Sequence, residues 1–202
     1  MASLPRQRYT PEQYLEIDRT SETKNEYFSG EIVAMAGASP THNRITLNVG
    51  SALNAQLRGT PCQPFANDLR VKSLATGSYM YPDVVVVCGR LELENTAPES
   101  LLNPTLIVEV LSPSTEVKDR GYKFAHYRRL DSLREYVLIA QHEPHIERYV
   151  RQPDGQWLLS EANDLNATIM LSSIGCTLAL SDVYDRVEFD GQADGEGDES
   201  EG

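Results

Sequence analysis

The sequence has no apolar run close to the roughly 20 residues that a helix needs to cross a bilayer. Its first residues, MASLPRQRYTPEQYL, also lack the continuous apolar segment of a secretory signal. Both absences argue against a membrane partner. We therefore expect a soluble, cytoplasmic protein.

Cysteine is scarce, and the three that occur are Cys62, Cys88 and Cys176. Their number is odd, they lie far apart, and their neighbours are mostly apolar. A disulfide framework usually has an even number of cysteines at closer spacing. We expect reduced thiols in the core, with no disulfide and no catalytic role.

Basic residues are also in short supply, with 18 Lys and Arg against 30 Asp and Glu and a net charge of -12. This balance argues against a protein that coats nucleic acid without specificity, because phosphate binding depends on Lys and Arg. Six of the acidic residues and no basic residue lie in 190–202, so the rest of the chain carries -6. Residues 116–135 hold six Lys or Arg against four Asp or Glu and form a local basic element.

Apolar residues make up 40% of the chain, which is enough for one core. No composition change marks a second domain, so residues 1–189 are predicted to form a single domain. The Gly-rich and acidic residues 190–202 cannot bury apolar surface and are predicted to be disordered.

Two helices are predicted in the first third of the chain. Thr10 before Pro11 and Gln13 indicates an N-capped helix that runs to about Asp18. Residues 40–58 predict a longer helix, which Gly and Pro end. Its apolar stripe comprises Ile45, Leu47, Val49, Ala52, Leu53 and Leu57.

Residues 106–111, LIVEVL, and 135–140, EYVLIA, are near-continuous apolar runs typical of strands buried on both faces. Between them we expect a helix from about Thr115 or Asp119 to Leu130. Its buried face comprises Phe124, Tyr127 and Leu130. This order predicts a βαβ crossover with parallel strands.

The other strands are predicted from alternation and turn signals. Residues 26–36 form a hairpin that turns at Ser29-Gly30, and 145–161 form one that turns at Pro153-Asp154-Gly155. A strand over 62–73 is expected to pair antiparallel with 81–87. The remaining expectations are a loop or short helical segment at 91–103, a last strand at 168–180 and a short helix at 180–184. Together these elements predict an α/β (α+β) protein with a central mixed β-sheet, flanking helices and extra β-hairpins.

Two apolar strands each contain one carboxylate: Asp83 opens YPDVVVV, and Glu109 interrupts LIVEV. A charge inside an apolar strand is costly to desolvate unless a metal, a hydrogen bond or a countercharge compensates it. Neighbouring strands could bring both carboxylates to one point, so we interpret the pair as a site for Mg²⁺.

A cation is harder to find beside this pair. Leu111 lies two residues after Glu109 on the same face of the strand, so no lysine stands next to the glutamate. Lys123 lies in the following helix, with Asp119 and Tyr127 at four-residue spacing on its face. Lys123 could reach back over the strand end into the same pocket.

These segments resemble the Uma2 (DUF820) family, which is assigned to the restriction-endonuclease-like PD-(D/E)XK superfamily. The resemblance covers roughly residues 8–185 and rests on an ordered set of pieces: YTPEQYL at 9–15, EYFSGEIVAMAG at 26–37, His42-Asn43, YPDVVVV at 81–87, LIVEVLSPST at 106–115, and the series Asp119, Lys123, Tyr127 followed by EYVLI. It implies a restriction-endonuclease-like core with Asp83 and Glu109 as the motif carboxylates. It also implies that the lysine role has moved from position 111 to Lys123, and that Glu26 completes the acidic pocket.

The leading hypothesis is an endonuclease that depends on Mg²⁺ or Mn²⁺ and hydrolyses phosphodiester bonds of nucleic acid. DNA is the expected substrate. Asp83 and Glu109 would bind the ion, with the Val110 carbonyl as a third ligand. Lys123 would orient water or stabilise the phosphate in the transition state, and Glu26 would assist. Because cutting two strands needs two sites, a homodimer is expected.

Two rival functions stay open. A nuclease fold without catalysis could act as a nucleic-acid-binding or regulatory module. Alternatively, the carboxylates could only stabilise the core of a structural or interaction protein, with Glu109 paired to Lys123 or an arginine. Asp83 could cap a turn after Pro82, and Lys123 could be a solvated helix residue.

The histidines also have ordinary interpretations. His42, near a helix start, is interpreted as a capping or packing residue rather than a base. His142 and His145, around Pro144, are interpreted as part of a turn rather than a zinc site, because no cysteine or further histidine accompanies them.

Overall fold

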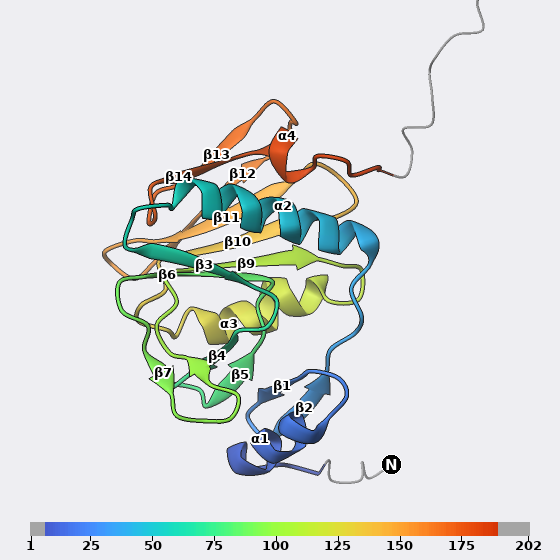
Figure 1. Ribbon diagram of the computed structural model, residues 1–202, viewed down its shortest axis with the longest axis vertical. Coiled ribbons are helices and arrows are strands. Elements are labelled where there is room, and N and C mark those ends of the chain that lie inside the picture. Colours follow the sequence, from blue (N-terminus) through green and yellow to red (C-terminus); the bar gives the residue numbers. More distant parts are fainter. Residues whose placement is uncertain (1–6, 190–202) are drawn as a thin grey trace, which may run out of the picture.

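Two six-stranded sheets and a two-stranded ribbon make up the β-structure of residues 7–189, the part of the chain that this computed structural model describes (Figure 1). The predicted disordered segment 190–202 lies outside the described residues. Within residues 7–189, no helix is long and apolar enough to cross a membrane.

The central sheet has the strand order β12-β11-β10-β9-β6-β3. Its strands are β3 (Cys62–Ala66), β6 (Val84–Cys88), β9 (Leu106–Leu111), β10 (Glu135–Ala140), β11 (Ile146–Arg151) and β12 (Trp157–Ala162). Strands β9 and β10 are parallel, and the other neighbours are antiparallel, which makes the sheet mixed as predicted. The hairpin of β11 and β12 forms one edge, at the turn that the sequence indicates.

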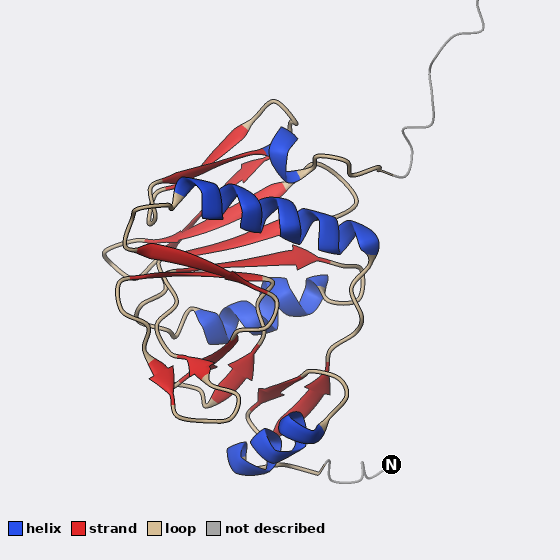
Figure 2. Ribbon diagram, in the orientation of Figure 1, coloured by secondary structure: helices blue, strands red, loops and turns tan. Residues whose placement is uncertain are grey.

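Helix α2 (Pro40–Gln56) covers one face of this sheet, and the helical segment that ends in α3 (Phe124–Tyr127) covers the other (Figure 2). Alternate residues of the central strands therefore enter two different cores. Val84 and Val86 of β6 pack in the cluster with α2 residues, whereas Val85 and Val87 pack in the cluster with Tyr127. Burial on both faces explains why these strands read as continuous apolar runs.

The second sheet has the order β2-β1-β5-β4-β8-β7. Its strands are short: β1 (Asn25–Phe28), β2 (Glu31–Ala34), β4 (Arg70–Ser73), β5 (Ser78–Met80), β7 (Leu93–Glu94) and β8 (Ser100–Leu101). The predicted first hairpin is confirmed, with positive φ at Ser29 and Gly30. Residues 91–103, expected as a loop or helical segment, instead contain β7 and β8.

The prediction of one strand over 62–73 is wrong. The chain turns at Asn67, which has φ 66°, and so leaves the central sheet. Only β3 pairs antiparallel with β6, and β4 pairs with β5 in the second sheet. Similarly, residues 168–180 form a hairpin of β13 (Thr168–Leu171) and β14 (Cys176–Ala179), where one strand was expected.

The first helix begins where the sequence places its cap. Helix α1 (Pro11–Thr20) has the predicted capping box, since Thr10 N donates to Gln13 Oε1 and Gln13 N donates to Thr10 Oγ1. In α2, however, Leu47 is 58% exposed, so its place in the predicted apolar stripe is wrong. The short helix α4 (Leu180–Val183) follows β14 as expected.

The helix expected between β9 and β10 differs in form. Residues Lys118–Lys123 make a π-helical turn, which continues into α3. The predicted inward face is confirmed at Tyr127 and Leu130, which are buried. The wider turn also buries Asp119 and Lys123 on the sheet side.

The expectation of reduced cysteines is wrong for two of the three. Cys62 of β3 and Cys88 of β6 are direct register partners and form a disulfide. Strand pairing brings these residues together although they are 26 positions apart in sequence. Cys176 remains a free, buried thiol.

Candidate active site

A cavity of about 880 Å³ opens where β1, the start of α2, β6, β9 and the π-helical turn meet. Its lining includes Glu26, Asp83, Glu109, Val110 and Lys123, which are the residues that the sequence singled out. Other polar residues also line it, among them His42, Lys118 and Asp119. The fold therefore collects all the predicted site residues in one place.

Strand register explains how the two motif carboxylates meet. Strands β6 and β9 pair Val84 with Val108, so Asp83, one residue earlier, falls opposite Glu109. The Val110 backbone N–H donates a hydrogen bond of 2.7 Å to Asp83 Oδ2. This bond fixes the Asp83 carboxylate at the end of the strand pair.

Lys123 lies among three carboxylates. Its Nζ is 2.6 Å from Glu109 Oε1 and 3.1 Å from Glu26 Oε1. The Asp119 Oδ1 atom, one turn earlier, is 3.4 Å away. Only 5% of the Lys123 side chain is exposed, so it is not a solvated helix lysine.

Glu26 of β1 connects two ammonium groups. Its Oε2 accepts a hydrogen bond from Lys118 Nζ, and its Oε1 accepts one from the Tyr81 backbone N–H. Burial by itself would raise the pKa of Glu26, but Lys123 and Lys118 outweigh it and hold that pKa below its ordinary value. Glu26 is therefore a stable anion.

The pKa of Glu109 shifts in the opposite direction to that of Glu26. Complete burial raises its pKa well above the ordinary value, although Lys123 opposes this, and the Asp119, Asp83 and Glu26 charges raise it further. Tyr127 donates a hydrogen bond of 2.9 Å to its Oε1. The pKa of Lys123 also rises well above its ordinary value, because Glu109 and Glu26 outweigh the desolvation that would lower it. Lys123 thus keeps its proton, and Glu109 is the carboxylate that most needs a further positive charge.

The charges of the cluster do not balance. Four carboxylates, on Glu26, Asp83, Glu109 and Asp119, face two ammonium groups, on Lys118 and Lys123. In the two motif carboxylates, Asp83 Oδ1 and Glu109 Oε2 accept no hydrogen bond from the described residues. These free oxygens, together with the excess of carboxylates over ammonium groups, suit a hard divalent cation such as Mg²⁺, which prefers oxygen ligands and retains several waters. The residues therefore fit the ion that the sequence predicts.

His42 is a member of the site that the sequence interpretation missed. Its Nε2 is 3.2 Å from Asp83 Oδ2, and its Nδ1 is buried without a hydrogen-bond partner among the described residues. Desolvation would lower the pKa of His42, but the hydrogen bond and charge of Asp83 outweigh it and raise that pKa. Interpreting His42 as a packing or capping residue overlooked this contact, since the helix start meets the end of β6 only in three dimensions.

A second cluster of possible ligands lies on the edge hairpin. Ligand atoms of His145, Glu147 and Glu161 all lie within 4.8 Å of one another. His142 is not part of this group. Glu147 is already paired with Arg120, and Glu161, which the β11–β12 register sets opposite Glu147, lies 3.1 Å from His145 Nε2. In the described residues, no third acidic, His or Cys ligand completes such a compact group with Asp83 and Glu109.

Known proteins are similar to this chain in sequence and in fold. Residues 11–181 match the Uma2 family, described as "Putative restriction endonuclease". Two uncharacterized proteins of Synechocystis sp. are similar. One, slr1290, is 35% identical over 93% of this chain and 97% of its own length, and the other, sll1609, is 37% identical over 81% and 92%.

A solved structure agrees with the fold. The crystal structure of a putative nuclease belonging to DUF820, from Anabaena variabilis, has a TM-score of 0.72 at 18% identity and covers 87% of this chain and 97% of that one. The match over residues 11–181 and the relatives above 30% identity extend over most of the sequence. The chain therefore belongs to the Uma2 family, as its motifs suggest.

Proposed function

We propose that this protein is a metal-dependent endonuclease that hydrolyses phosphodiester bonds of DNA. The observation that carries the proposal is the 2.6 Å contact between Lys123 Nζ and Glu109 Oε1, on a strand whose neighbour presents Asp83. It supplies the cation that position 111 lacks. Membership of a family described as "Putative restriction endonuclease" supports the same reaction.

Asp83 and Glu109 would hold the ion through their free oxygens, with the Val110 carbonyl as a third protein ligand. Bound Mg²⁺ or Mn²⁺ polarises the scissile phosphate and lowers the pKa of a coordinated water. The Val110 N–H and His42 orient the Asp83 carboxylate for this task.

Lys123 would act as a charge and not as a base. Its raised pKa keeps it protonated, so it can donate hydrogen bonds to the attacking water or to the phosphate oxygens as negative charge develops. Glu26 positions Lys123 and Lys118 by contacting both ammonium groups. Lys118, 27% of whose side chain is exposed, lies toward the mouth of the cavity, where a phosphate would approach.

The substrate is proposed to be DNA, cut by a homodimer. Residues 116–135 are the basic stretch of an otherwise acidic chain, and their first turn carries Lys118 and Lys123 into the site. Because residues 7–189 of each chain form one such cluster, cleavage of both strands of a duplex would use two chains.

The direct test is cleavage of plasmid, linear duplex, single-stranded DNA and RNA in Mg²⁺ or Mn²⁺. We expect cleavage that chelation stops and that Asp83→Ala abolishes, while the exposed Glu99→Ala control cleaves like the wild type. Binding without cleavage would instead indicate a nuclease fold that has lost catalysis. If neither nucleic acid nor metal binds, the cluster is structural and the proposal is wrong.

A further inference from the structure

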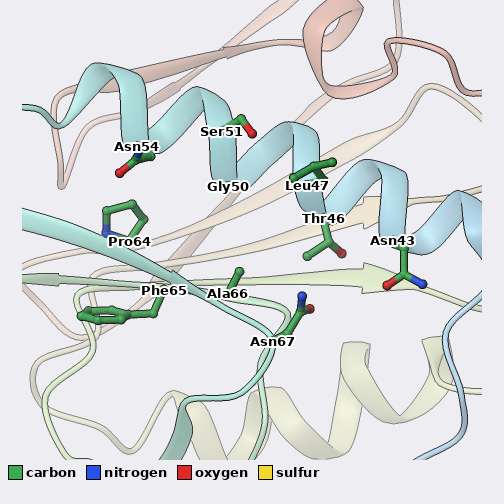
Figure 3. A pocket seen from close by; sticks show the side chains of 10 residues that line it. All are labelled: Asn43, Thr46, Leu47, Gly50, Ser51, Asn54, Pro64, Phe65, Ala66 and Asn67. Atoms are coloured by element: carbon green, nitrogen blue, oxygen red, sulfur yellow. The ribbon is translucent and has the colours of Figure 1, made fainter.

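A second, smaller cavity of about 270 Å³ lies between α2 and the edge strand β3 (Figure 3). One wall is helical and the other is the strand with the turn that follows it. The ten residues that line the cavity are Asn43, Thr46, Leu47, Gly50, Ser51, Asn54, Pro64, Phe65, Ala66 and Asn67. We call it the α2–β3 groove.

The groove adjoins the candidate active site. Asn43 and Asn67 line both cavities. Asn43 follows His42, which contacts Asp83, and the Asn67 backbone N–H donates a 2.9 Å hydrogen bond to the Asp83 carbonyl. A strand of nucleic acid whose phosphate reached Asp83 could therefore place a neighbouring nucleotide in the groove.

The lining of the groove is uncharged and mixes polar with apolar side chains. None of the ten residues is charged, and they include three side-chain amides and two hydroxyl groups. Figure 3 shows Asn43 extending from α2 and Asn67 from the end of β3. Amides offer donors and acceptors side by side, as base edges do, whereas a phosphate would need cations. Leu47, 58% exposed, adds apolar surface for the flat face of a base.

Gly50 keeps the groove open. Glycine is the poorest helix former after proline, yet it occupies the middle of α2. A Cβ at this position would meet no atom within 4 Å, so packing within the chain does not require a glycine. Its lack of a side chain leaves space in the groove that a ligand can occupy.

Two cations flank the groove along the chain. Arg44 follows Asn43, and Arg58 follows the C-terminal end of α2. Both are exposed, and neither forms an ion pair within the described residues. Phosphates of a nucleic-acid strand that runs along α2 would find these guanidinium groups available at the two ends of the helix.

We propose that the α2–β3 groove binds an unpaired base of the DNA strand next to the scissile phosphate, with Asn43 and Asn67, at the end of the groove that adjoins the active site, reading its edge. This inference rests on the proposed nuclease function, because a nucleic-acid strand must lie at Asp83. It assigns a sequence preference to a face of the molecule outside the catalytic cluster. A base in the groove must leave its stack, as in other proteins that read extruded or single-stranded bases.

The test fills the groove. Gly50→Leu adds a side chain where the fold has space, and Ala55→Leu adds the same side chain at an exposed position of α2 outside the groove. Binding of a labelled mixed-sequence single-stranded oligonucleotide is measured in Ca²⁺ by fluorescence anisotropy, alongside the same backbone without bases. We expect Gly50→Leu to bind the normal oligonucleotide about tenfold more weakly than the wild type, in line with the loss of one stacked base, and to bind the abasic backbone equally. Ala55→Leu should match the wild type on both.

Other outcomes overturn the inference. If Gly50→Leu binds both oligonucleotides like the wild type, the groove holds no base. If it changes only the oligomeric mass in sedimentation, the groove seats a second copy of the chain. Sequencing the ends of cleaved random DNA separates the two proposals: unchanged base preference in an active Gly50→Leu protein refutes the groove alone, whereas a wild type that neither cleaves nor binds refutes both. Melting curves of the two leucine variants check that both are folded.

Discussion

Two buried charge clusters in this protein differ in how completely their groups are satisfied. The first is Arg70 of β4 with Asp18 of α1, whose side chains are 0% and 3% exposed. The Arg70 guanidinium bonds Asp18, Ser100, Thr96 and the Pro98 carbonyl, and it lies over the rings of Tyr14 and Tyr79. One positive charge meets one negative charge, and every nitrogen of the guanidinium is used.

The cluster around Lys123 is nearly as buried at Lys123 and its three carboxylate neighbours, but it is neither balanced nor saturated. Its carboxylates outnumber its ammonium groups, and Asp83 and Glu109 each keep an oxygen without a hydrogen bond from the described residues. The Arg70 pair is what a structural ion pair looks like, because burial is tolerated only when partners compensate it. Uncompensated charge that faces a cavity is typical of a ligand-binding or catalytic site. The contrast argues against a purely structural role for the Lys123 cluster.

The largest expected effect is a loss of cleavage activity on mutation of the Lys123 cluster. Lys123→Met keeps the length of the side chain and removes the charge, so cleavage should fall by about 10²–10³, the loss typical of removing one group that stabilises transition-state charge. Lys72→Met, which breaks an ion pair with Glu94 outside the site, should leave the rate unchanged. Initial rates on DNA in Mg²⁺ measure both. An unchanged rate in folded Lys123→Met would remove the lysine from the mechanism.

The second effect concerns stability and belongs to the other cluster. Arg70→Met leaves Asp18 buried without its countercharge, which should lower the free energy of unfolding by about 3–5 kcal/mol. The exposed pair of Arg19 and Glu16 provides the control, because Arg19→Met should have no measurable effect. Urea unfolding followed by circular dichroism gives both values. A small loss for Arg70→Met would mean that the saturated pair is not structural.

A divalent cation should stabilise one cluster only. At a concentration 100 times its dissociation constant, an ion that binds only the folded state adds about 2.7 kcal/mol, which raises the melting temperature. We expect Mg²⁺ or Mn²⁺ to produce such a rise in the wild type, and chelation to reverse it. Asp83→Ala should abolish the rise, while Glu99→Ala should retain it. A rise of the same size in Asp83→Ala would place the ion elsewhere, for example at His145, Glu147 and Glu161.

Local signals in the sequence were sufficient for many elements. The capping box of Thr10 and Gln13 and the turn at Ser29-Gly30 depend on neighbours a few residues apart, and both are confirmed. The disulfide between Cys62 and Cys88 was not predictable in this way, because it depends on the register of β3 against β6. That register in turn depends on the turn at Asn67, where no glycine signals the positive φ.

The same division applies to the candidate site. Asp83 and Glu109 stand out because each is a charge in an apolar strand, and the spacing of Asp119, Lys123 and Tyr127 marks one helical face. Lys118 carries no such mark: its partner, Glu26, lies 92 residues away. The Leu47 error has the same origin, since periodicity fits it to the α2 stripe but the open α2–β3 groove leaves it exposed.

A smaller effect on stability is expected when one carboxylate of the Lys123 cluster is neutralised. Glu109→Gln removes one of the surplus negative charges, and the amide oxygen can still accept the Tyr127 hydrogen bond. In metal-free protein, the free energy of unfolding should therefore stay within about 1 kcal/mol of the wild type. The hydrogen bond from Tyr127 to a neutral amide is weaker than the bond to a carboxylate, but the repulsion among the carboxylates is relieved, and these two effects oppose each other. Urea unfolding in chelator measures the difference. A loss as large as that of Arg70→Met would show that Glu109 is a structural ion-pair partner after all.

The smallest effect is a dependence on pH that His42 contributes. Asp83 raises the pKa of His42 in the folded protein above the ordinary value of 6.5. The folded state then binds the proton more tightly than the unfolded state, so the stabilisation is fully present below about pH 6.5 and disappears as the pH rises through the folded pKa. In metal-free protein, the difference in unfolding free energy between wild type and His42→Gln should be larger at pH 6 than at pH 8.5. Urea unfolding at the two pH values tests this. A difference independent of pH would mean that the imidazole beside Asp83 stays neutral. The negative charge of the cluster would then be compensated by a metal ion alone.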